Sequence, residues 1–140
     1  MNIHYFNEDV NFQITKEKHL TDWILDIIHS YQFDLEILNY IFCSDQYLLE
    51  LNKEHLNHDY YTDIITFDNS DETNKIESDI FISIDRVKEN AKKQSVALND
   101  ELYRVMIHGV LHLIGFNDKT PKEKALMREK ENACLSLLKI

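Results

Sequence analysis

Apolar side chains recur at two spacings along this chain, and the spacing separates the expected helices from the expected strands. A spacing of three or four residues gathers apolar side chains on one helix face, whereas strict alternation gathers them on one face of a strand. The helical spacing predicts helices near residues 15–29, 45–57, 85–95, 99–114 and 121–138. Alternating, β-branched runs predict strands at 2–6, 33–41, 63–68 and 75–84, with the last two joined as a hairpin.

This order of elements predicts an α+β fold, in which a small mixed four-stranded sheet packs with about five helices. We expect one domain spanning residues 1–140, because no repeat and no Pro/Gly/Ser-rich linker interrupts the sequence. With 140 residues, 44% of them hydrophobic, the chain is able to bury a single core without disulfide bonds.

Polar residues with capping chemistry mark the expected starts of several helices. Thr15, Ser44 and Asn99 are the predicted N-caps of the first, second and fourth helices. Thr120 and Glu123, with a proline between them, predict a capping box that opens the last helix. Along that helix, the side chains expected to pack against the domain are Ala125, Leu126, Ala133, Leu137 and Leu138.

Charge and cysteine content limit the classes of protein to which this chain can belong. A net charge of −10 argues against a protein that coats nucleic acid through its overall charge. The charge is unevenly distributed along the sequence. Residues 1–85 carry 4 basic and 18 acidic side chains, a net charge of −14, whereas residues 86–140 carry 11 basic and 7 acidic side chains, a net charge of +4. Neither a signal peptide nor a membrane span is expected, since the chain has no apolar leader and no long apolar run. The isolated Cys43 and Cys134 favour a reducing, cytoplasmic location.

Both glycines of the chain lie within residues 108–118, which predict a metal site at the end of a central helix. His108 and His112 are four residues apart, so on a helix they differ in direction by about 40° and project from one face. Gly115 follows three residues later, where a positive φ angle would end the helix and let Asp118 turn back to the same ion. The predicted metal ligands are therefore His108, His112 and Asp118. The other histidines form no such pattern, and none is expected to be a ligand: His4, His19, His29, His55 and His58.

Three protein ligands leave a tetrahedral ion one open position, which is typical of catalytic sites. A water molecule bound there would ionise near pH ~7 and act as the nucleophile, and no side chain is assigned as general base. Two imidazoles and a carboxylate suit one Zn²⁺ per chain, although they accept other divalent ions. The ligand spacing matches the metzincin proteases, but Gly109 stands where those enzymes carry their general-base glutamate. Peptidase activity by that route is disfavoured.

Residues 108–118, HGVLHLIGFND, resemble the signature H-G-x-L-H-L-x-G-Y-D-H of the YbeY-type endoribonucleases. Leu51-Asn52, Asp59 and the TDIITF run at 62–67 resemble that family's LN…TDVLSF stretch, and residues 78–80 resemble its Gly-Asp-Ile strand. The resemblance covers about residues 45–120. It implies a bacterial, cytoplasmic, zinc-dependent endoribonuclease that cuts single-stranded RNA.

The resemblance also implies a role in maturation of the 16S rRNA 3′ end and in ribosome quality control. The implied partners are rRNA and the ribosome or small-subunit proteins, with no membrane and no DNA expected. We expect a cleft lined from the basic C-terminal half of the chain to hold RNA through its phosphates. Asp63 and Asp79 resemble recurring family positions, and for each the alternatives are a part in the chemistry, stabilisation of the backbone, or support of the metal ligands from behind.

Two positions depart from the family pattern. Asp118 replaces the usual third histidine, which keeps a zinc ligand but adds negative charge to the site. Leu56 replaces a usual arginine, so a phosphate contact from that position is missing or moved. Arg104 is a candidate replacement, because it lies four residues before His108 on the same helical stripe. The alternative for Arg104 is a solvated or salt-bridged side chain near Glu101.

Two other functions stay open at this point. The first is a ribosome-assembly factor that binds rRNA or a ribosomal protein and uses its metal for local structure. The second is a zinc hydrolase with another substrate, a peptide or a small molecule, which Gly109 disfavours.

Overall fold

The computed structural model describes residues 2–140. The strands are β1 (Ile3–Asn7), β2 (Asp34–Cys43), β3 (Ile64–Asp68) and β4 (Lys75–Ser83). The helices are α1 (Glu17–Ser30), α2 (Asp45–Leu56), α3 (Ile84–Gln94), α4 (Leu98–Ile114) and α5 (Pro121–Ser136). Across these described residues the predicted α+β fold, with its mixed four-stranded sheet and five helices, is confirmed.

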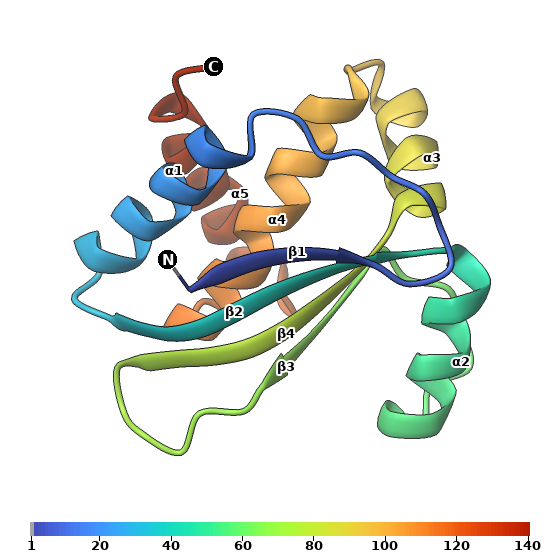
Figure 1. Ribbon diagram of the computed structural model, residues 1–140, viewed down its shortest axis with the longest axis horizontal. Helices are drawn as coiled ribbons and strands as arrows, with labels where there is room; N and C mark the ends of the chain where they lie inside the picture. The colour runs from blue at the N-terminus through green and yellow to red at the C-terminus, as the bar shows by residue number, and fades with distance from the viewer. Residues whose placement is uncertain (1) are drawn as a thin grey trace.

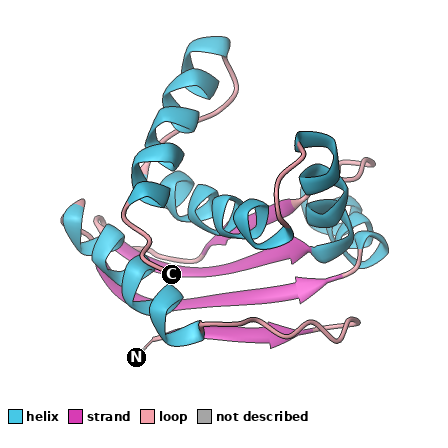
Figure 2. Cartoon of the chain, turned by 90° about the horizontal axis from the view of Figure 1, so that it is seen from above, coloured by secondary structure: helices cyan, strands magenta, loops and turns pink. Residues whose placement is uncertain are grey.

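The strands form one sheet in the order β1-β2-β4-β3 (Figure 1). β1 and β4 run parallel to β2, and β3 pairs with β4 in the antiparallel sense. The predicted hairpin of the third and fourth strands is therefore present, with Ile64 opposite Ile82. In both views α1, α4 and α5 lie on one side of the strand layer, and α2 lies apart from them near the end of β2 (Figures 1 and 2).

The main core lies between the sheet and helices α1 and α4. Its large, fully buried side chains include Tyr40, Ile80 and Met106. The Tyr40 hydroxyl donates a hydrogen bond of 3.0 Å to the Met106 carbonyl, which fixes α4 to β2 two residues before His108. A smaller apolar cluster around Leu48 and Ile65 packs α2 on β3. Both histidines of the motif are thus carried by a helix that is held rigidly against the sheet.

Two of the predicted N-caps are confirmed. The Ser44 side chain accepts a hydrogen bond from the Tyr47 amide at the start of α2. The Thr120 hydroxyl accepts one from the Glu123 amide, and the Glu123 carboxylate accepts one from the Thr120 amide, which completes the capping box of α5. These local patterns were readable because they depend on neighbours in the sequence alone.

The other two predicted N-caps are wrong. The N-cap of α1 is Lys16 in the left-handed conformation, with φ 56° and no side-chain cap, so Thr15 lies outside the helix. The N-cap of α4 is Ala97, and Asn99 is already inside the first turn. At α4 the earlier start places Leu98 against the core, so tertiary packing overrides the preference of asparagine for the cap.

The predicted inner face of α5 is also wrong. Its buried residues are Met127, Glu131 and Cys134, spaced four and three residues apart, whereas Leu126 and Leu137 are exposed. Ala125 and Ala133 are exposed too, and only the predicted Leu138 packs partly against the core. The apolar pattern predicted the wrong face because a charged residue, Glu131, occupies the middle of the buried face.

No helix in residues 2–140 is both long and apolar enough to cross a membrane.

Candidate metal centre

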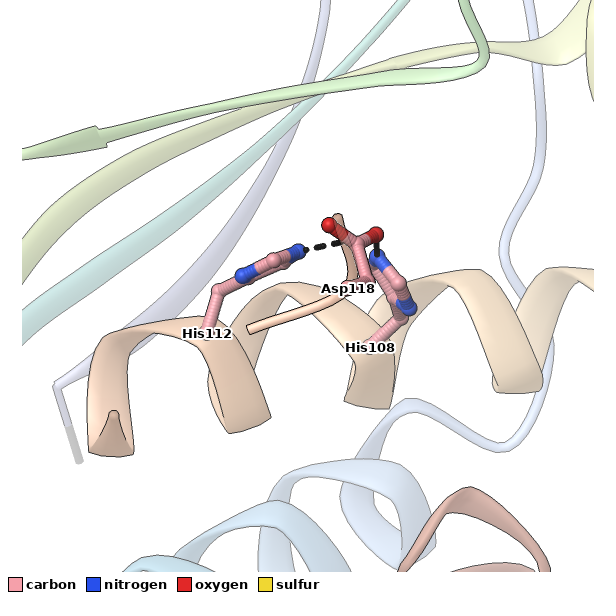
Figure 3. Close-up of side chains that lie close together, drawn as sticks. All are labelled: His108, His112 and Asp118. Atoms are coloured by element: carbon pink, nitrogen blue, oxygen red, sulfur yellow. Dashed lines mark ion pairs between the residues drawn. The ribbon is translucent and has the colours of Figure 1, made fainter. Parts of the chain in front are cut away.

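His108 and His112 project from one face of α4, as their spacing predicts, and Asp118 returns to meet them (Figure 3). The two imidazole centroids lie 4.6 Å apart. Asp118 Oδ2 lies 3.2 Å from Nε2 of His108 and 3.3 Å from Nε2 of His112. The structure therefore brings together all three side chains that the sequence selects as metal ligands.

Gly115 ends α4 and makes this meeting possible. Its φ angle is 124°, a value that side-chain-bearing residues rarely adopt. Its amide bonds to the carbonyls of Leu111 and His112, and the Phe116 amide also bonds to Leu111. The Phe116 ring then packs edge-on against Tyr31, with 5.7 Å between centroids. The chain is thereby turned back along the helix, which carries the following residues to the histidine face.

Two of the three donor-atom separations match the edges of a tetrahedral ion, and all three atoms lie within 4.8 Å of one another. Zinc bonds of about 2.0–2.2 Å to nitrogen and oxygen give a tetrahedron with edges of about 3.4 Å. The two separations from Asp118 Oδ2 to the imidazole nitrogens, 3.2 and 3.3 Å, are close to that edge. The side chains of His108, His112 and Asp118 are 20, 31 and 37% exposed, so a fourth position would be open to solvent or substrate. The cluster could hold one divalent ion of the size of Zn²⁺.

Glu131 of α5 supports the centre from behind, and sequence reasoning missed it. This residue is only 5% exposed, and its Oε2 lies 2.6 Å from Nδ1 of His108. Burial alone would raise the pKa of Glu131, but hydrogen bonds from His108 and Arg104 outweigh it and lower the pKa. The carboxylate is therefore ionised and accepts the hydrogen bond from Nδ1, so Nε2 is the His108 nitrogen that faces Asp118 and that would bind an ion once it has lost its proton.

Arg104 pairs with the same carboxylate. Its Nη1 lies 2.9 Å from Oε1 of Glu131, and its Nη2 donates to Asn132 at 2.8 Å. The salt-bridged alternative for Arg104 is the one observed, with Glu131 rather than Glu101 as the partner. Because this guanidinium already neutralises a buried carboxylate, it is not a free replacement for the arginine that the family has at Leu56.

Gly109 has a steric reason for being glycine. A Cβ atom there would lie 3.0 Å from the Cδ1 atoms of Ile64 and Ile80 and 3.3 Å from Oγ1 of Thr66. The position next to the first histidine thus points into the sheet and lets α4 approach β3 and β4 closely. A side chain in this place would be directed at Ile64, Ile80 and Thr66 and not at the triad, which agrees with the absence of the protease glutamate.

The two aspartates singled out by the family resemblance lie on different sides of the sheet. Asp63, just before β3, is next to the triad, and its Oδ2 accepts a hydrogen bond of 3.2 Å from Asn90. Burial raises the pKa of Asp63, and the nearby charge of His108 partly offsets that rise. Asp79 accepts a hydrogen bond of 3.0 Å from Asn39 on the neighbouring strand, on the face that does not carry α4. Asp79 therefore contributes to the sheet and not to the centre.

The triad lies in a hollow of about 710 Å³ between α4 and the segment that joins α2 to β3. Among its lining residues are Leu56 and three carboxylates, those of Asp63, Asp68 and Asp118. Lys119 is the one lysine or arginine in this lining. The expected basic cleft is therefore not found in this lining. Arg104 and Arg128 line an adjoining hollow of about 390 Å³ that shares His108 and Asp118, but Glu101 and Glu131 line it too.

The remaining histidines do not join the cluster. Within residues 2–140, the three side chains of the triad are the one group of His, Cys, Asp and Glu with three donor atoms close enough to share an ion. His58 and Tyr60 line the same hollow, with Oη of Tyr60 3.0 Å from Nδ1 of His58. Sequence periodicity gave no signal for either residue, since both lie in an irregular segment.

Comparison with known proteins extends the resemblance to nearly the whole chain. The sequence profile of the family Endoribonuclease YbeY matches residues 2–139. Endoribonuclease YbeY of Cytophaga hutchinsonii is 55% identical over 137 residues, which cover 98% of this chain and 96% of that protein. Endoribonuclease YbeY of Parabacteroides distasonis is 47% identical over 138 residues, or 99% of this chain and 96% of that protein.

The fold has a counterpart among solved structures. The solution structure of TM1509 from Thermotoga maritima superposes with a TM-score of 0.67 at 27% identity, covering 96% of this chain and 87% of that one. The sequence similarity and the shared fold extend over the same elements that build the triad. The chain therefore belongs to the YbeY endoribonuclease family.

Proposed function

We propose that this endoribonuclease cuts single-stranded RNA with the help of one zinc ion held by His108, His112 and Asp118. The observation that carries the proposal is the pair of 3.2 and 3.3 Å donor separations, which suit a tetrahedral ion with one open position. When bound, zinc supplies Lewis-acid chemistry: it polarises a phosphate oxygen and makes water a better nucleophile. Hydrolysis then adds water across one P–O bond of the backbone.

The residues of the chain prepare the site for this chemistry. Glu131 fixes the His108 ring and its tautomer, so Nε2 is available without rearrangement. Asp118 adds a negative charge that favours binding of a divalent cation over a monovalent one. The partial exposure of all three ligands, in an open hollow, favours a catalytic ion over a purely structural one.

We extend the proposal to the biological setting on the strength of family membership. Residues 1–140 form one catalytic domain that acts in the cytoplasm on rRNA, at the 3′ end of the small-subunit RNA, and in ribosome quality control. Its partners are the ribosome or small-subunit proteins that present this RNA. The support for this setting is the identity of 42–55% to proteins named Endoribonuclease YbeY, together with the position of the triad.

The test is cleavage of a labelled single-stranded rRNA 3′-end fragment by purified protein, after chelation, and after zinc is restored. The proposal expects cleavage that chelation abolishes and zinc restores. His112→Ala should bind no zinc and cut nothing, whereas His19→Ala, at an exposed histidine outside the cluster, should match the wild type. Cleavage at the normal rate by metal-free His112→Ala protein would overturn the proposal, as would equal cleavage of a fully paired duplex.

A further inference from the structure

The hollow that contains the triad has an aromatic part that the proposed chemistry does not use. The Tyr60 ring lines this hollow and is 50% exposed. The His58 ring stands beside it, with 5.1 Å between centroids and an angle of 62° between planes. The hydrogen bond between Tyr60 Oη and His58 Nδ1 holds the two rings in this arrangement. An aromatic face is thus presented to solvent within the cavity that the metal ligands share.

The charge of the same hollow argues against phosphate as the main point of attachment. Its lining combines Asp63, Asp68 and Asp118 with a single cationic side chain, Lys119. Unless a metal ion offsets these carboxylates, they repel a polyanion. Nearby, the exposed Leu56 extends the uncharged part of the wall. Away from the ion, the attraction that this cavity offers to RNA is stacking and apolar contact, not charge.

We propose that Tyr60 stacks on an unpaired nucleobase of the RNA whose backbone lies at the triad. The proposal rests on the proposed function and adds a base-binding subsite to it. Every nucleobase has a π-face, so such stacking tolerates sequence. A base inside a duplex has both faces covered by its neighbours, whereas a base in a single strand is free to stack on Tyr60. The subsite therefore gives a physical cause for a preference for single-stranded substrates.

The segment that carries Tyr60 is held in place by its backbone. The buried Asn52 side chain donates a hydrogen bond of 3.0 Å to the Tyr60 carbonyl. The Asn52 carbonyl accepts another, of 3.2 Å, from the His58 amide. Neither bond involves the tyrosine ring, so Tyr60→Ala removes the aromatic face while it leaves the anchors of the loop intact.

Tyr61 provides a matched control. It has the same side chain, lies next in sequence and is 52% exposed. Its ring, however, lies 5.4 Å from the Arg86 guanidinium and is not part of the lining of the hollow. Tyr61→Ala thus removes an equally exposed ring from the same segment without touching the subsite.

The experiment measures single-turnover cleavage of a single-stranded rRNA 3′-end fragment by zinc-loaded protein. Tyr60→Ala should raise the half-saturating protein concentration about 5- to 150-fold, the range of aromatic stacking, and change the maximal rate less than about threefold. The half-saturating concentration of Tyr61→Ala should stay within about twofold of the wild type. Tyr60→Phe keeps the stacking face but loses the hydrogen bond to His58, so its half-saturating concentration should lie well below that of Tyr60→Ala. The slope of log affinity against log salt should not change in Tyr60→Ala, since stacking releases no counterions.

A substrate series identifies the base as the contacting group. Replacing nucleotides one at a time by abasic sites should weaken the wild type at one position and leave Tyr60→Ala unaffected there. Equal affinities of Tyr60→Ala and Tyr61→Ala would overturn the inference while leaving the proposed function intact. A changed salt slope would overturn it too, because the contact would then be to phosphate. If the wild type cuts no RNA even with zinc, the proposed function fails first and takes this inference with it.

Discussion

Glu131 on α5 and Nδ1 of His108 on α4 share a hydrogen bond of 2.6 Å, which joins the last helix of the chain to the candidate metal centre. Burial of the imidazole would lower the pKa of His108, but this bond and the nearby Asp118 raise it overall. A strong bond on one side of the ring fixes its tautomer and makes the other nitrogen a better ligand. We therefore expect the position of α5 to influence how well the histidines of α4 bind an ion.

The first prediction concerns zinc affinity. Glu131→Ala should weaken zinc binding about 10- to 100-fold, because the His108 ring loses its orienting acceptor. The zinc affinity of Glu131→Gln should lie between those of Glu131→Ala and the wild type, since its amide oxygen still accepts the hydrogen bond from Nδ1 but carries no charge. Competition titration with a zinc indicator measures both. Glu129→Ala, at an exposed position of the same helix, is the control, and a Glu131→Ala affinity equal to that of the control would refute the role of Glu131.

The second prediction concerns Gly109. Gly109→Glu should destabilise the fold by at least about 3 kcal/mol, because a carboxylate would be forced against Ile64 and Ile80 with no partner. Gly109→Ala should cost less, since only two δ-methyl groups and the Thr66 hydroxyl must yield. Urea unfolding compares the variants. A stable Gly109→Glu protein that digests casein would show that this position faces the metal after all.

The third prediction concerns the pH dependence of stability at Asp63. Burial raises the pKa of Asp63 in the folded state above its value in the unfolded chain. Protonation of Asp63 therefore stabilises the fold; this stabilisation is complete below the pKa of the unfolded chain and is lost as the pH rises through the pKa of the folded state. The ionised carboxylate thus costs stability at pH 7. Asp63→Asn, which still accepts from Asn90, should raise the melting temperature of metal-free protein at pH 7 and do so less at pH 4. The exposed Asp68→Asn should show no such difference, and a lower melting temperature for Asp63→Asn at pH 7 would contradict the account.

The fourth prediction concerns the two cysteines, which are free and buried. Burial, together with nearby carboxylates such as Asp9, raises the pKa of Cys43 to about 12. Burial raises the pKa of Cys134 as well. Since the thiolate is the reactive form, neither residue should react with a thiol reagent at pH 8 in the native protein, and both should react in denaturant. Rapid labelling of the native protein would contradict this burial.

Much of the fold and the main cluster followed from local sequence patterns. The alternation of apolar residues around Ile80 fixed the strand and its buried face, and the capping box at Thr120 fixed the start of α5. The histidine spacing and Gly115 placed the triad, because helix geometry and a positive φ angle are properties of a few neighbouring residues. These features need no knowledge of distant parts of the chain.

The features that sequence reasoning missed depend on contacts between distant residues. Glu131 lies 23 positions from His108, and hydrophobicity did not predict the inner face of α5 because this buried residue is charged. The excess of basic residues in the C-terminal half does not make the hollows beside the triad basic, because acidic residues line them as well and Arg104 pairs with Glu131. The proposed aromatic subsite at Tyr60 lies in an irregular segment, where periodicity carries no information.

The most direct test of the central claim is the zinc content of the purified chain and of Asp118→Ala, measured by mass spectrometry after exposure to equimolar zinc and desalting. The account predicts about one zinc ion per chain in the wild type and almost none in Asp118→Ala, since two imidazoles alone hold the ion weakly. A wild type that retains no metal would contradict the claim. An Asp118→Ala variant that retains a full ion would show that the third ligand lies elsewhere.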